Sequence, residues 1–184
     1  ALGDQDLWAH EAVTLRRVCR DHMKAITAAI EQSGHRVDFN EAGDTCTIHR
    51  GENPQGVDLV TAPYPGYPTD MQAQMTALLA TTPGISVIKD TIFPQRFMHC
   101  AELKRMGADI KVDNGTAVVR GVAQLSAAPV MASDLRASAA LVLAALTAKG
   151  STEISRRYHI DRGYEHIDEK LLMLGADVER VKDR

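Results

Sequence analysis

Apolar residues recur along this chain with two different periods, and the alternation between them predicts a mixed α/β fold. Residues 1–33 carry Leu, Val, Met and Ile at helix-compatible intervals, and Gly34 is a natural end for a helix. The pattern leaves open whether this part is one helix or two pieces broken near residues 19–21. Further helices are predicted over residues 69–80, 96–106, 137–148 and 164–174, and strands over residues 36–40, 45–49, 57–61, 85–93, 109–112, 116–120, 151–158 and 177–181.

A module of strand, helix, strand, helix and paired strands recurs along the chain. Its clearest sign is a glycine between a helix and a strand, which occurs at Gly34, Gly107 and Gly175. The first copy is incomplete at its beginning, and the last lacks its final strand. The helix at residues 137–148 is apolar nearly all round and is expected to be buried on every side. We therefore expect two or three copies of one module around a shared centre of buried helices.

The segment before residue 69 is stiff and leads the chain into a helix. Three prolines within residues 62–68 exclude a helix and a central strand there, so this segment is predicted to be an extended loop. Thr69 and Gln72 then have the spacing of a capping box, in which each side chain bonds the other residue's backbone N–H.

Composition narrows the classes of function. A chain of 184 residues has the length of one domain. Its net charge of −3 and its 4% of aromatic residues do not indicate binding to nucleic acid. No apolar run has the length of a membrane span, and the start does not resemble a signal peptide. Three cysteines without a CxxC spacing favour reduced thiols, so we expect a cytoplasmic protein with no membrane partner.

Two aspartates stand at equivalent helix starts and are the first candidates for chemistry. Asp70 and Asp134 each follow a hydroxyl residue and precede an apolar helix. The simpler interpretation is that both are helix caps, which helix starts favour. The repeat and the stiff loop before Asp70 favour a second interpretation, in which a carboxylate orients a sugar hydroxyl or accepts its proton.

Three arginines are candidates for binding an anion. Arg136 lies in the first turn of a helix, where the dipole disfavours a cation, so it either binds an anion or pairs with Asp134. Arg96 and Arg162 follow the two aspartates at almost the same interval. Each could form an ordinary surface ion pair, as Arg162 could with Asp161 or Glu165, or could bind a phosphate or carboxylate. The histidines show no metal spacing, and no phosphate loop is present, so no metal and no cofactor are predicted.

Four strings of residues, in order along the chain, resemble the UDP-N-acetylglucosamine 1-carboxyvinyltransferases. They are TAPYPGYPTDMQAQ at residues 61–74, RFMH at 96–99, DLRAS at 134–138 and HIDRGYE at 159–165. Members of that family transfer enolpyruvate from phosphoenolpyruvate to the 3-hydroxyl of UDP-N-acetylglucosamine in peptidoglycan synthesis and release phosphate. The family fold has two domains, each with three βαβαββ units whose helices pack inward, and the substrates bind between them.

The resemblance implies roles for the candidate residues. Asp70 matches the family's aspartate that contacts the sugar 3-hydroxyl and is its proposed base, and Asp134 matches one that faces the reacting centre. Ile92 and Phe93 match positions that contact the UDP-sugar, and Arg96 matches an arginine beside that site. Arg136 and Arg162 match the arginines that bind phosphoenolpyruvate. These roles agree with the interpretation reached from the residues themselves.

The chain resembles most of one domain of the family, the C-terminal one, over residues 22–184, whereas residues 1–21 do not follow the family. Half of the cleft is therefore expected to come from a missing N-terminal domain or a second copy of the chain, and little turnover is expected from this chain alone. Two alternatives remain. The first is a relative that uses shikimate 3-phosphate, although the PTDMQ and HIDRG strings favour the UDP-sugar enzymes over it. The second is a non-catalytic module that binds UDP-sugar or an anion.

Overall fold

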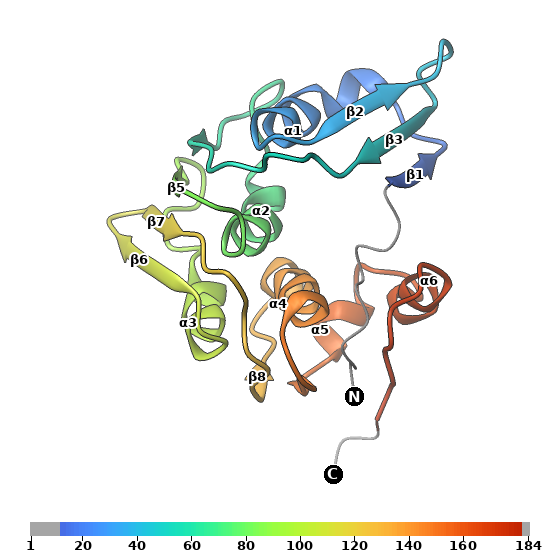
Figure 1. The fold of residues 1–184 in the computed structure, drawn as a ribbon. Helices are drawn as coiled ribbons and strands as arrows, with labels where there is room; N and C mark the ends of the chain where they lie inside the picture. Colours follow the sequence, from blue (N-terminus) through green and yellow to red (C-terminus); the bar gives the residue numbers. More distant parts are fainter. Residues whose placement is uncertain (1–11, 182–184) are drawn as a thin grey trace.

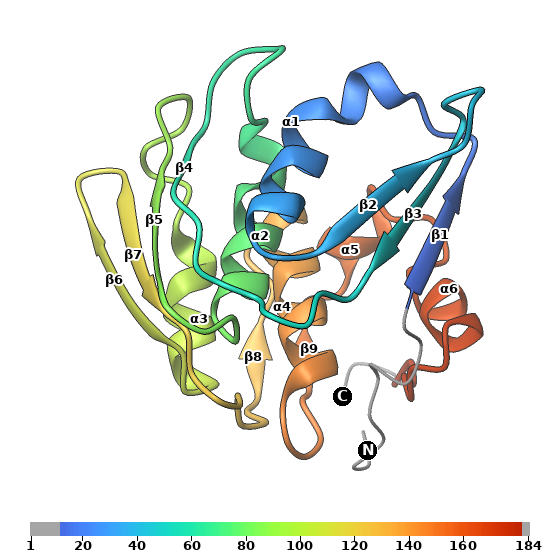
Figure 2. The same cartoon turned by 45° about the horizontal axis from the view of Figure 1, so that its top comes forward.

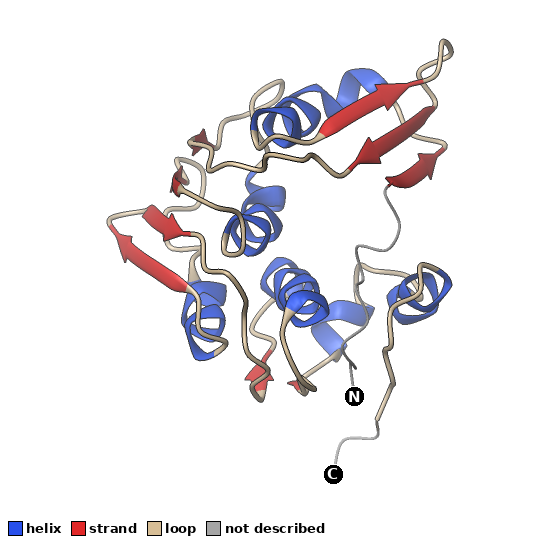
Figure 3. Ribbon diagram, viewed as in Figure 1, coloured by secondary structure: helices blue, strands red, loops and turns tan. Residues whose placement is uncertain are grey.

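The computed structural model describes residues 12–181, in which strands lie at the periphery and the central helices fill the interior, whereas the last helix lies at an edge (Figures 1 and 3). Three sheets are present within these residues, with strand orders β1-β3-β2, β4-β5-β7-β6 and β8-β9. Each sheet belongs to one copy of the predicted module. The predicted α/β fold of repeated units with helices packed inward is confirmed.

The first copy contains the antiparallel sheet β1-β3-β2 and one helix. Its elements are β1 Ala12–Arg16, α1 Arg20–Gln32, β2 Arg36–Phe39 and β3 Thr45–His49. The helix predicted over residues 1–33 is correct for α1 but wrong for residues 12–16, and residues 1–11 lie outside the described part. Val13 and Leu15 are two residues apart, which is the spacing of a strand. The pairing of this segment with β3 makes it a strand and not a helix.

The second copy is the most complete. Its elements are β4 Leu59–Val60, the short 3-10 helix η1 Thr69–Met71, α2 Gln72–Leu79, β5 Ile85–Lys89, α3 Met98–Arg105, β6 Asp109–Asp113 and β7 Thr116–Arg120. β4 and β5 pair in parallel, with α2 as the crossover, whereas β7 pairs antiparallel with both β5 and β6. The predicted hairpin turns at Asn114 and Gly115, which both have positive φ.

The third copy repeats the parallel crossover and then departs from the prediction. Its elements are β8 Val130–Met131, α4 Leu135–Thr147, β9 Ile154–Ser155, α5 Tyr158–Asp161 and α6 Ile167–Met173. The strand predicted over residues 151–158 is limited to β9, and α5 begins inside its predicted range. No strand is present over residues 177–181, because no later strand within the described residues is there to pair with that segment.

The helix-ending glycine of the predicted corner is present in all three copies, but within the described residues a strand follows it only after Gly34 and Gly107. Gly34, Gly107 and Gly175 follow α1, α3 and α6 with φ of 93°, 91° and 89°. A left-handed backbone at this point ends each helix and redirects the chain, and glycine adopts it without a steric cost.

The core is centred on the contact between α2 and α4, which lie side by side (Figure 2). Both helices are rich in buried alanine, at Ala73 and Ala77 on α2 and at Ala140 and Ala144 on α4, and small side chains favour close helix packing. The prediction that α4 is buried on every side is wrong at Leu143, whose side chain is 41% exposed. No helix among the described residues is both long and apolar enough to cross a bilayer.

Candidate functional site

Asp70 is held between two arginines that come from different parts of the chain. Arg96 donates from Nη1 to Asp70 Oδ1 at 2.8 Å, and Arg136 donates from Nη2 to Oδ2 at 2.9 Å. Asp70 lies in η1, Arg96 just before α3, and Arg136 in the first turn of α4. The structure therefore brings together three residues that the sequence had singled out separately.

The capping box predicted for Thr69 and Gln72 is wrong. The hydroxyl of Thr69 instead donates to Asp90 Oδ2 at 2.7 Å, and neither end of η1 or α2 has a side-chain cap. Gln72 is fully buried, and neither polar atom of its side chain has a partner among the described residues. In place of the local capping bond, the Thr69 hydroxyl makes a long-range hydrogen bond to a carboxylate, and bonds to an ionised acceptor are stronger than those between neutral groups.

Asp90 is a residue of the site that the sequence analysis missed. It follows β5, its side chain is only 2% exposed, and it accepts hydrogen bonds from the hydroxyls of Thr61 and Thr69 and from the backbone N–H groups of Ile92 and Phe93. Burial raises the pKa of Asp90, but these hydrogen bonds outweigh burial and leave it below the usual value. One signal was available: an aspartate directly after an apolar strand marks the carboxyl end of a parallel pair, where α/β sites form.

The loop fixed by Asp90 carries the next three candidates. Ile92 and Phe93 are both exposed, at 36% and 51%, so their side chains can meet a ligand or another domain. The Arg96 guanidinium lies over the Phe93 ring at 4.6 Å and also donates to Thr69 Oγ1 at 3.3 Å. Phe93 and Thr69 therefore orient Arg96 toward Asp70.

Asp134 is the N-cap of α4, and it does not bind the side chain of Arg136. Its Oδ1 accepts from the backbone N–H groups of Arg136 and Ala137 at 2.8 and 2.9 Å. The Arg136 side chain extends to Asp70 and also donates from Nη1 to the Tyr164 hydroxyl at 3.1 Å. Tyr164, which the sequence analysis did not select, thus connects the third copy of the module to the site.

The two arginines keep Asp70 ionised. The hydrogen bond from Arg136 is the largest cause that holds the pKa of the Asp70 carboxyl below its usual value, partial burial opposes it, and the hydrogen bond from Arg96 adds to it. Each oxygen accepts from one guanidinium and keeps a second lone pair, so the carboxylate can also accept from a hydroxyl beside two arginines that can bind an anion. The arrangement can therefore couple an anion to a hydroxyl group.

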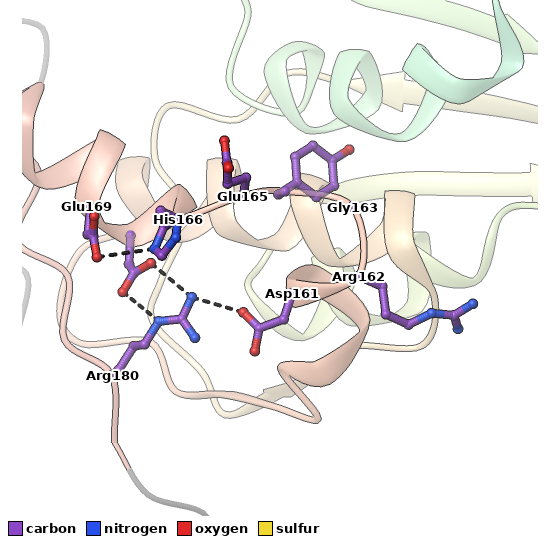
Figure 4. Close-up of a pocket in the computed structure, with 9 residues that line it drawn as sticks. Asp161, Arg162, Gly163, Glu165, His166, Glu169 and Arg180 are labelled. Carbon is purple, nitrogen blue, oxygen red and sulfur yellow. Dashed lines mark hydrogen bonds and ion pairs between the residues drawn. The ribbon is translucent and has the colours of Figure 1, made fainter.

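Arg162 is not in contact with this cluster. It lines an open pocket of about 670 Å³ formed by the turn around residues 161–169 and by Arg180. Figure 4 shows Arg162 pointing away from Asp161, whose carboxylate pairs with Arg180 at 2.9 Å. Of the two interpretations of Arg162, the ion pair with Asp161 or Glu165 is absent from the described structure, in which Glu165 pairs with Lys170 and Asp161 with Arg180. Tyr164 lines the same pocket, so the pocket borders the Arg136 end of the site.

The histidines do not form a metal centre in the described part of the chain, where no three His, Cys, Asp or Glu side chains converge on one point. His99 is buried beside Cys100 and stacked on Phe97. Burial lowers the pKa of His99 to about 4, against a smaller opposing effect of Asp134. His99 is therefore a neutral core residue at physiological pH.

Comparison with known proteins places the chain in a family. Residues 8–171 match the family described as EPSP synthase (3-phosphoshikimate 1-carboxyvinyltransferase). The chain is 73% identical over 173 residues to a UDP-N-acetylglucosamine 1-carboxyvinyltransferase of Akkermansia muciniphila, and 50% identical over 171 residues to one of Halorhodospira halophila. These matches cover 94% and 93% of this chain but only 41% and 40% of the relatives, so the chain spans about two fifths of their length.

Solved structures agree on the fold. The enolpyruvyl transferase NikO from Streptomyces tendae superposes with a TM-score of 0.80 at 30% identity, over 94% of this chain and 41% of that one. EPSP synthase from Acinetobacter baumannii superposes with a TM-score of 0.71 at 18% identity, over 98% of this chain and 44% of that one, and supports the fold alone. Because the family matches most of the length of this chain, the chain belongs to the EPSP synthase (3-phosphoshikimate 1-carboxyvinyltransferase) family of enolpyruvyl transferases.

Proposed function

We propose that this chain forms one wall of the substrate cleft of a UDP-N-acetylglucosamine 1-carboxyvinyltransferase. The reaction is the transfer of enolpyruvate from phosphoenolpyruvate to the 3-hydroxyl of UDP-N-acetylglucosamine, with release of phosphate, in peptidoglycan synthesis. The relatives that carry this name are 73% and 50% identical to the chain, and the four strings of the resemblance lie in its described part. The remaining three fifths of such a protein would supply the opposite wall.

One observation carries the assignment of roles: a single carboxylate shared by two arginines from different elements. A carboxylate is the group that accepts a hydroxyl proton, and arginines bind phosphate and carboxylate in a bidentate manner. In the proposal Asp70 meets the sugar hydroxyl, while Arg136 and Arg162 bind phosphoenolpyruvate. Ile92, Phe93 and Arg96 contact the UDP-sugar, and Asp134 faces the reacting centre.

The ion pairs of Asp70 support a way in which binding of one substrate would affect the other. Arg136 donates to Asp70 Oδ2. Phosphoenolpyruvate would attract Arg136 and release Asp70 Oδ2, which could then accept the hydroxyl proton of the sugar. Anion binding would thereby raise the basicity of Asp70 at the moment when a base is needed.

Binding of candidate ligands to the ¹⁵N-labelled chain tests the proposed substrate. We expect UDP-N-acetylglucosamine to shift the amide resonances of Ile92, Phe93 and Thr69, and shikimate 3-phosphate to cause no shift at equal concentration. Lys111, on the far strand β6, provides an internal control amide. Shifts with shikimate 3-phosphate alone would favour the alternative substrate, which the name of the matched family also suggests.

A second candidate function is binding without catalysis, since the described residues form an anion-binding cluster around Asp70. We expect the chain alone to release no phosphate from phosphoenolpyruvate and UDP-N-acetylglucosamine, because one wall cannot exclude water. Fusion to the remaining part of the Akkermansia muciniphila relative distinguishes the candidates. Restored phosphate release would support a transferase part, and an inactive but folded fusion that still binds the sugar nucleotide would support a binding module. Turnover by the chain alone at the rate of a complete enzyme would contradict the proposed division of the site.

A further inference from the structure

Beyond the residues assigned to substrates, one buried carboxylate connects several parts of the site. We propose that Asp90 is a positioning residue that acts through Thr69 to hold Arg96 in place against Asp70. The inference rests on the proposed function for the role of Asp70, and its test is carried out without any ligand, so that the two can fail separately.

The two oxygens of Asp90 have different tasks. Oδ1 accepts from Thr61 Oγ1 at 2.7 Å and from the backbone N–H groups of Ile92 and Phe93 at 2.9 and 2.8 Å. These bonds tie the loop after β5 to the end of β4. Oδ2 accepts from Thr69 Oγ1 at 2.7 Å, and Thr69 is its only donor in the described chain. One oxygen therefore shapes the loop, and the other reaches the residue next to Asp70.

The charge of Asp90 fixes the direction of the Thr69 hydroxyl. A hydroxyl has one proton and two lone pairs, whereas an ionised carboxylate can only accept. The proton of Thr69 must therefore point to Asp90, which leaves a lone pair for Arg96 Nη1, 3.3 Å away. The same Nη1 atom donates to Asp70 Oδ1 at 2.8 Å. A continuous chain of hydrogen bonds thus runs from Asp90 through Thr69 and Arg96 to Asp70.

An amide in place of the Asp90 carboxylate would weaken this series of hydrogen bonds at its link to Thr69. In Asp90→Asn, Oδ1 can keep its three bonds, but an NH₂ group replaces Oδ2 and donates to Thr69. The Thr69 hydroxyl then accepts from that NH₂ group and no longer donates to an anion, so it loses the fixed orientation and the polarisation that made it a strong acceptor for Arg96. The expected result is a folded chain in which Arg96 is held less firmly beside Asp70.

The test is the titration of the Asp70 carboxyl, followed by ¹³C NMR in the free chain. The charged groups that contact Asp70 are Arg96 and Arg136, and Tyr164 lies beyond Arg136. With Arg96 loosened, we expect Asp90→Asn to raise the titration midpoint of Asp70 by about half a pH unit. An unchanged midpoint in a folded Asp90→Asn chain would overturn the proposal, because a merely structural role would not act on Asp70.

Companion variants keep the test decisive if Asp90→Asn does not fold. Thr69→Val removes the hydroxyl and should raise the Asp70 midpoint, whereas Thr69→Ser keeps the hydroxyl and should leave it unchanged. Equal midpoints in these two variants would also overturn the proposal. Asp58→Asn is the matched control, since Asp58 Oδ1 accepts from Val87 N at 2.8 Å and so joins β4 to β5 away from the site. Its Asp70 midpoint should equal that of the unmodified chain.

Discussion

The Asp70 carboxylate is shared by two guanidinium groups and is still half exposed, at 49% of its side-chain surface. Its pKa is lowered in the folded chain, so its contribution to stability is present above the ordinary value of 3.8 and is lost as the pH falls through the folded value. Solvent screening keeps that contribution small. The importance of these ion pairs therefore lies in ligand binding more than in folding.

Replacing Asp70 by asparagine separates the effect of the ion pairs on stability from their effect on ligand binding. We expect Asp70→Asn to change the free energy of unfolding by less than about 1 kcal/mol, measured in urea. Because Arg96 and Arg136 lose their anionic partner, the affinity for inorganic phosphate should rise severalfold at low salt, measured by calorimetry. Asp109→Asn, which removes a partner of Arg120 elsewhere, is the control. Unchanged phosphate affinity in Asp70→Asn would show that the arginines are not available to an anion.

His99 makes the stability of the chain dependent on pH. Its pKa is about 4 in the folded chain against 6.5 for an ordinary histidine, so the unfolded chain binds more protons between these values. Stability is therefore complete above pH 6.5 and is lost as the pH falls toward 4, by at most about 1.4 kcal/mol per pH unit. Urea unfolding from pH 7.5 to 4.5 measures this slope. It should flatten in His99→Gln and persist in the exposed control His166→Gln, and equal slopes in both variants would refute the assignment.

Sequence reasoning found the residues whose signal is local. Asp70, Asp134 and Arg136 were selected because of their places at helix starts, and the structure puts Asp70 and Arg136 in direct contact. Asp90 and Tyr164 were not found, since their importance depends on partners that are distant along the chain. The capping box failed for the same reason.

At the scale of elements, α4 begins at a cap that is both structural and part of the site. Asp134→Ala should lower the free energy of unfolding by about 1 kcal/mol, because two backbone N–H groups of the first turn lose their acceptor. Asp134→Asn should keep most of that stability, since an amide oxygen can cap a helix, while it removes the charge. Chemical denaturation of the two variants measures the difference, and equal losses would show that the charge and not the cap stabilises the helix.

The elements that sequence predicted best are those with a local stop signal. The glycine corners and the hairpin at Asn114 depend on backbone conformations that few residues adopt, so their positions could be read directly. The segment at residues 12–16 fits both periods, and only its pairing with β3 makes it a strand. The segment at residues 177–181 has strand composition but no partner strand in the described structure, which a single sequence does not reveal.

At the scale of the whole molecule, the three copies differ in completeness and not in plan. The order β1-β3-β2 of the first sheet repeats the order β5-β7-β6 of the second, so β1 occupies the place of β5. Among residues 12–181, the first copy has no counterparts of β4 and α2, and the third has no counterparts of β6 and β7. This agrees with a chain that spans about 41% of the length of its Akkermansia muciniphila relative.

The very short parallel pairs also have a consequence for how the chain folds. β4 meets β5 over two residue pairs, and β8 meets β9 over two, whereas the hairpin of β6 and β7 joins five. A parallel pair must close a long loop for few hydrogen bonds, so it gains stability only after its crossover helix has packed. In pulsed hydrogen exchange during refolding, amides of β6 and β7 should be protected first, and the Thr61 and Val130 amides, which bond Lys89 and Glu153, last. Simultaneous protection would contradict this order, under which the α2–α4 interface is the late step that assembles the site.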